Sequence, residues 1–70
     1  MYEVRKYRMS KPRNRLVPDG GVTYLNEWLD VEYHMQSVDI DASPFYTSPT
    51  TSCWWSPVTN CTFVVIKEVN

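Results

Sequence analysis

The sequence has very little of what a helical protein is built from. Alanine occurs once in 70 residues and leucine three times, whereas valine, threonine, tyrosine and tryptophan are frequent. Alanine and leucine favour helices, and β-branched and aromatic residues favour strands. These proportions exclude an all-helical bundle and leave room for one short helix.

Long hydrophobic runs are also missing. No apolar stretch approaches the ~20 residues of a membrane-spanning helix, and no apolar stretch of a secretory signal follows the basic amino end. We therefore predict a cytoplasmic protein that makes no membrane contact. With 43% hydrophobic and 14% aromatic residues, the chain is expected to fold as a single domain over residues 1–70.

Residues that support catalysis or metal binding are scarce. The chain has one histidine, His34, and its two cysteines, Cys53 and Cys61, lack the short Cys-x2-4-Cys spacing of a structural zinc site. No serine or cysteine stands in a nucleophile signature, and Asp39 and Asp41 are typical of the solvent edge of a strand. We expect no catalytic residue, no metal and no cofactor, and free thiols rather than a disulfide.

The pattern of the chain predicts strands at both ends and a helix between them. Residues 2–9 have strand-like composition, and residues 62–69 are β-branched and almost continuously apolar, as in a central strand. Residues 22–36 carry two competing periods. Tyr24, Leu25, Trp28 and Leu29 recur at helical spacing, whereas Leu29, Val31, Tyr33 and Met35 alternate as in a strand. We therefore predict a helix over about residues 23–31, with Thr23 as its N-cap, followed by a strand over about residues 33–40.

These elements predict an α+β fold, with a small three-stranded antiparallel sheet and one helix packed on a face. A small all-β sheet is the alternative. Proline, glycine, serine and threonine are concentrated in residues 10–21 and 41–60, which are expected to be loops. The second loop is long for a compact domain, and loops of that length are often functional.

The middle of the chain resembles a known family. Residues 25–38 (LNEWLDVEYHMQSV) are similar to the pattern Leu-Asn-Glu-Leu, a three-residue spacer, then Gly-Trp-Glu-Leu-Val-Ser-Val, which marks a small bacterial and phage family of unknown function. Glu32 stands where that family has glycine. Residues 2–7 and 63–66 resemble its first and last strands. The resemblance implies a three-stranded antiparallel sheet with one helix, no catalytic residues, and a phage or mobile-element origin.

Charge is distributed unevenly along the chain, although the net charge is only -1. Six of the seven basic residues lie near the amino end: Arg5, Lys6, Arg8, Lys11, Arg13 and Arg15. With Tyr2 and Tyr7 among them, these cations suit a polyanion whose bases stack on the rings. Against this, a cationic edge also keeps sheets from pairing, and a pI of about 5.6 is low for a dedicated nucleic-acid binder.

Trp54 and Trp55 are the most unusual feature of the sequence. Two adjacent bulky rings are not expected to enter one thin core together, so at least one is expected to be exposed. Tryptophan is enriched at binding hot spots, which makes this pair, with Tyr46 from the same segment, a candidate anchor for a partner or for a second copy. The competing interpretation is a loop folded back over a small core.

The leading functional hypothesis is a non-enzymatic binding protein of phage or mobile-element type. It is expected to act in the host cytoplasm by occupying a surface on a host protein or protein complex, for example as an inhibitor of a defence complex. The predicted contact residues are Trp54, Trp55, Tyr46, Arg5, Arg8 and Arg13. The alternative is a binder of nucleotides or single-stranded nucleic acid, and a third hypothesis is a self-associating homo-oligomer.

Overall fold

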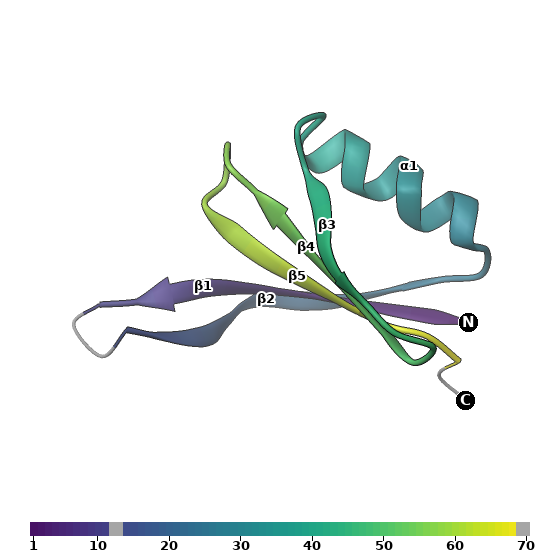
Figure 1. The fold of residues 1–70 in the computed structure, drawn as a ribbon, viewed down its shortest axis with the longest axis horizontal. Helices are drawn as coiled ribbons and strands as arrows, with labels where there is room; N and C mark the ends of the chain where they lie inside the picture. The colour runs from purple at the N-terminus through teal and green to yellow at the C-terminus, as the bar shows by residue number, and fades with distance from the viewer. Residues whose placement is uncertain (12–13, 69–70) are drawn as a thin grey trace.

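The chain folds into a five-stranded antiparallel sheet with one helix (Figure 1). The computed structural model describes residues 1–11 and 14–68. Its elements, in chain order, are β1 (Tyr2–Ser10), β2 (Arg15–Leu25), α1 (Trp28–Val38), β3 (Ser43–Thr47), β4 (Thr51–Ser56) and β5 (Cys61–Ile66).

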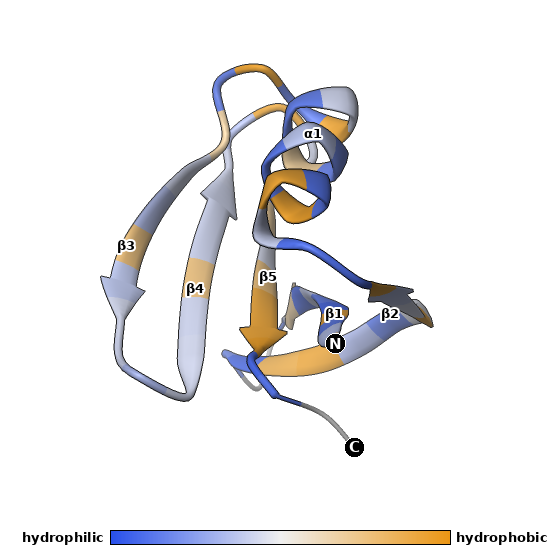
Figure 2. Cartoon of the chain, turned by 90° about the vertical axis from the view of Figure 1, so that its right-hand side faces the viewer, coloured by the Kyte–Doolittle hydropathy of each residue, from blue (hydrophilic) through white to orange (hydrophobic). Residues whose placement is uncertain are grey.

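The sheet has the strand order β2-β1-β5-β4-β3. A hairpin, β1–β2, and a meander, β3–β4–β5, are joined where β1 pairs with β5, and every pairing is antiparallel. Helix α1 connects the two edge strands and lies over one face of the sheet (Figure 2). We call that side the helix face and the other side the open face.

The prediction of a three-stranded sheet is wrong, and the all-β alternative is closer to the observed strand content. Residues 41–60 contain β3 and β4, and most of residues 10–21 belongs to the hairpin. The prolines made these segments resemble loops in the sequence, but each of the four prolines that the structure describes sits where a strand or turn tolerates it. Pro18 and Pro44 are on the two edge strands, and Pro49 and Pro57 lie in the turns that flank β4.

The position of the helix also differs from the prediction. Thr23 is not an N-cap but a strand residue paired with Val4, and the helix begins five residues later, at Trp28. The predicted strand over residues 33–40 lies mostly within the helix. Every second residue from Leu29 to Met35 is apolar, which is typical of a strand, but only Val31 and Met35 are buried while Leu29 and Tyr33 are exposed.

The core lies between the helix and its face of the sheet. Val31 and Met35 of α1 are fully buried against a layer formed by Val4, Trp54, Cys61, Phe63 and Val65. Burial of one large apolar side chain contributes roughly 1.5–3 kcal/mol, so a core of this size can support a small domain. The predicted first strand and the predicted central position of the last strand are confirmed by β1 and β5.

A buried carboxylate fixes the end of the helix to the sheet. Asp39, which is 5% exposed, accepts hydrogen bonds from Ser56 Oγ at 2.7 Å, from the Asp41 N–H at 2.8 Å and from the Val58 N–H at 3.1 Å. The hydrogen bond from Ser56 is the main reason that the pKa of Asp39 lies below its ordinary value. Asp39 is therefore a structural residue, not the solvent-edge residue that the sequence predicts.

Candidate contact surface

The two adjacent tryptophans lie on opposite faces of β4. Trp54 is 8% exposed and belongs to the core, where its ring centroid is 6.5 Å from that of Trp28. Trp55 is 40% exposed and points to the open face, because neighbouring residues of a strand alternate between the two sides. The expectation that at least one ring is exposed is confirmed. Trp54 covers the core, as the competing interpretation expects, but it does so from a strand and not from a loop, and the contact role of Trp55 stays a prediction.

The register of the sheet identifies the other residues of the open face. Directly paired residues on neighbouring strands share a face, so one row across the sheet reads Val22, Arg5, Val64, Cys53, Tyr46. The next row reads Pro18, Tyr7, Thr62, Trp55, Ser43, and the row on the other side reads Tyr24, Glu3, Ile66, Thr51. Among the described residues, no element packs over these rows.

Most of this surface is apolar or aromatic. Val22, Tyr24, Tyr46 and Trp55 are each at least 40% exposed, and Val64 is half-buried at the centre. Exposed apolar side chains gathered on one face of a sheet are a feature of binding surfaces. The open face is therefore the candidate contact surface, and the structure brings three of the predicted contact residues to it: Trp55, Tyr46 and Arg5.

The charged groups of the open face neutralise each other. Arg5 Nε lies 2.7 Å from Glu3 Oε2, and Glu3 is buried while the Arg5 side chain is half exposed. The hydrogen bond from Arg5 is the main cause that lowers the pKa of Glu3 below its ordinary value. Arg5 therefore lies on the open face, but its charge is already paired with the carboxylate of Glu3.

The remaining predicted cations lie elsewhere. Arg8 pairs with Cys61, which is buried on the helix face, so Arg8 projects from the side opposite Trp55. Arg13 lies outside the described residues. The exposed residues Lys11 and Arg15 lie at the closed end of the β1–β2 hairpin, which projects beyond the other strands (Figure 1). Arg8, Lys11 and Arg15 thus lie on a surface separate from that of Trp55.

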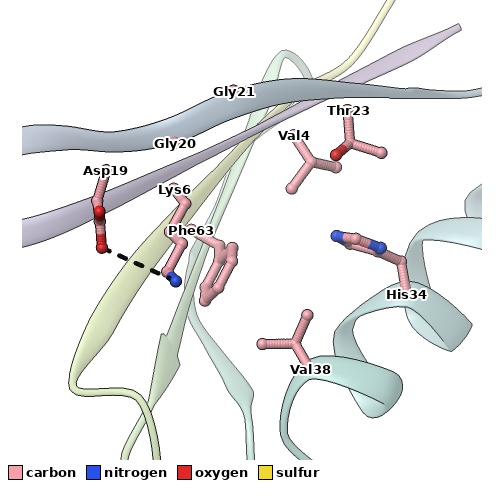
Figure 3. A pocket seen from close by; sticks show the side chains of 9 residues that line it. All are labelled: Val4, Lys6, Asp19, Gly20, Gly21, Thr23, His34, Val38 and Phe63. Atoms are coloured by element: carbon pink, nitrogen blue, oxygen red, sulfur yellow. Dashed lines mark ion pairs between the residues drawn. The ribbon is translucent and has the colours of Figure 1, made fainter.

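A cavity of about 300 Å³ lies on the helix side, between α1 and the hairpin (Figure 3). Val4, Val38 and Phe63 line it, with His34 facing them from the helix. Lys6 Nζ and Asp19 Oδ2 are 3.8 Å apart at its rim. The irregular part of β2, where Asp19 to Gly21 stand opposite Lys6 alone, forms part of the wall of this cavity.

The residues considered for a zinc site are not brought together. Cys53 is on the open face, whereas Cys61 is buried on the helix face, with its thiol 3.9 Å from Asp19 Oδ2. Both cysteines are free. Within residues 1–11 and 14–68, no three histidine, cysteine or acidic side chains cluster as metal ligands do. The described part of the chain also has no helix of the length and apolarity needed to cross a membrane.

Sequence reasoning missed most of the open face. The sequence predicts Tyr7 as a stacking ring beside the basic residues, but it does not predict Val22, Tyr24 or Val64 as contact residues. The strand β2 is not predicted, and residue types alone do not show which side of the last strand faces outward. One signal was available. The run Thr62 to Ile66 is apolar at nearly every position, which is typical of a strand that is covered on both sides. Only one of its sides is covered by the helix.

Comparison of the chain with protein-family models, with curated proteins and with solved structures finds no match. The family resemblance carried by residues 25–38 therefore stays a prediction, and the functional argument depends on the geometry of the open face.

Proposed function

We propose that this chain is a small non-enzymatic binding protein and that the open face of its sheet is its contact surface. The observation that supports the proposal is a set of exposed apolar and aromatic side chains on one face that no described element covers, with Trp55 among them. Tyrosine and tryptophan suit such surfaces, because each combines a large apolar area with one polar atom.

The chemistry of this face favours a protein partner over a polyanion. The cation that the register places there, Arg5, is held by Glu3, so it is not free to neutralise a phosphate. The narrower hypothesis, that the partner is a host protein or complex and that the chain inhibits a defence system, depends on the phage-family resemblance and on the small size of the chain. No contact in the structure carries this narrower hypothesis, and it stays part of the proposal on the basis of the resemblance and the size alone.

Affinity capture tests the proposed function. Tagged wild-type chain, Trp55→Ala and Tyr33→Ala are immobilised and exposed to a lysate of cells that also produce the untagged chain. Mass spectrometry then identifies the proteins that each variant retains, including untagged copies of the chain. Tyr33 is a matched control, because it is an exposed aromatic residue on the outside of α1. We expect a retained protein that is lost with Trp55→Ala and kept with Tyr33→Ala. The reverse pattern, or loss with both variants, would contradict the proposal.

A second candidate function, binding of nucleotides or single-stranded nucleic acid, is favoured by one observation. Arg8, Lys11 and Arg15 are all exposed along the projecting hairpin. Binding there depends on counterion release, so it weakens steeply with salt. Titration of a fluorescent oligonucleotide at low salt with wild type and with Arg8→Glu/Arg15→Glu tests it. No binding at low salt, or binding that the double variant retains, counts against this function.

A further inference from the structure

We infer that the partner of the open face is a second copy of this chain, packed sheet against sheet. This inference rests on the proposed function, since it names the occupant of the same face. The helices α1 and the basic hairpins of both copies lie outside such a dimer, where other molecules can still reach them.

The first argument is the composition of the central strand. In β5, Cys61, Phe63 and Val65 are buried under the helix, while Val64 and Ile66 point the other way. Apolar side chains on both sides of a strand are typical of sheets that are covered on both faces. A second sheet supplies a cover of the right shape, since two sheets pack about 10 Å apart through interdigitating side chains.

The second argument is charge. A twofold dimer brings a surface against itself, so a face that carries net charge repels its own copy. The charged residues in the three rows of this face are Glu3 and Arg5, and they neutralise each other within one chain at 2.7 Å. Apposition of two copies is therefore not opposed by like charges. A strongly acidic or basic partner would find no free countercharge in these rows.

The third argument is area. Five strands about 4.8 Å apart and about six residues long give each copy a face of roughly 24 by 20 Å. Two opposed faces of this size can remove at most roughly 1,000 Å² from solvent, because the sheet is twisted (Figure 1), and this upper bound equals the ~1,000 Å² expected of a specific interface.

The edges of the sheet are poor alternatives for self-association. β2 has Pro18 and an irregular register at Asp19 to Gly21, and β3 is five residues long with Pro44 and an irregular register beside it. Proline, bulges and short strands are the features that prevent edge-to-edge pairing.

Sedimentation equilibrium of the purified chain over about three decades of concentration tests the inference. Wild type is expected to change from 8.3 kDa to twice that mass as concentration rises. Val64→Lys places a charge at the centre of the face and is expected to weaken association at least 100-fold. Val58→Lys, in the exposed β4–β5 turn, is the matched control and is expected to associate as wild type. Circular dichroism verifies that each variant is folded.

Val22→Lys and Tyr46→Lys provide the same test at two more exposed positions, in case Val64→Lys does not fold. A wild type that stays at 8.3 kDa at every concentration overturns the dimer. So does a dimer that persists in the face variants and is lost in Val58→Lys. A strictly monomeric chain that still retains a different protein through Trp55 would refute this inference and leave the proposed function intact.

Discussion

Trp54 and Trp55 are adjacent in sequence, yet replacing each by alanine should have very different effects on folding. Trp54 is almost fully buried, and its ring continues an aromatic row in which the Trp28 and Tyr2 centroids are 5.6 Å apart. Removing a buried aromatic side chain costs about 3–5 kcal/mol. A domain of this length is stabilised by roughly 4–10 kcal/mol in total, so Trp54→Ala removes a large part of its stability.

Trp55 makes a smaller contribution to folding of the single chain. It is 40% exposed, and its neighbours on the open face are Thr62 and Ser43. Cross-strand contacts of this kind contribute about 0.2–1 kcal/mol, so Trp55→Ala should lower the free energy of unfolding by no more than about 1 kcal/mol. Its main effect is expected on binding, which is the opposite of the expectation for Trp54→Ala.

Urea unfolding followed by circular dichroism at low protein concentration measures both effects. With a urea dependence of about 1 kcal/mol per M, Trp55→Ala shifts the midpoint down by about 1 M at most, and Trp54→Ala by about 3–5 M or to the loss of a folded baseline. Equal shifts for the two variants would refute the assignment of the rings to opposite faces. A larger shift for Trp55→Ala would refute it more strongly.

Three further outcomes follow from the structure. Gly20 has φ +109, so Gly20→Ala should destabilise the chain by about 1 kcal/mol in thermal unfolding, whereas Gly21→Ala, with open space around its Cβ position, should change little; equal effects would be contrary to the structure. The pKa of Asp39 is lowered by folding, so its contribution to stability is complete above roughly pH 4 and is lost as pH falls below that value. Urea unfolding as a function of pH measures this loss, and Asp39→Asn should reduce it. A variant whose free energy of unfolding falls with acid as steeply as that of wild type would count against the role of Asp39. A thiol reagent should modify the half-buried Cys53 before the buried Cys61 in the native monomer, as peptide mapping would show, and preferential labelling of Cys61 would contradict their placement.

The strands at the two ends of the chain were predictable because their composition alone identifies them. β1 and β5 are rich in β-branched and aromatic residues and contain no proline. The helix was predicted to exist but was placed five residues too early. Trp28, Val31, Met35 and Val38 are spaced as one helix face, but the alternation that includes Leu29 and Tyr33 obscured this period.

The middle strands were not predictable from local sequence, because their evidence is tertiary. Ser43–Thr47 is exposed at every position and contains a proline, so only its pairing with β4 makes it a strand. The contact surface was missed for the same reason. Which of two adjacent tryptophans faces outward depends on the register with β5, and residue types alone do not determine that register.

The measurement that tests the open face most directly is the nuclear magnetic resonance spectrum of the indole N–H groups of Trp54 and Trp55 as protein concentration is raised. Trp55 should shift progressively as its face becomes covered, together with the amides of Val64 and Cys53, while Trp54 should stay constant in the core. The account is contradicted if Trp55 does not move at any concentration while Leu29 and Tyr33, on the outside of the helix, do.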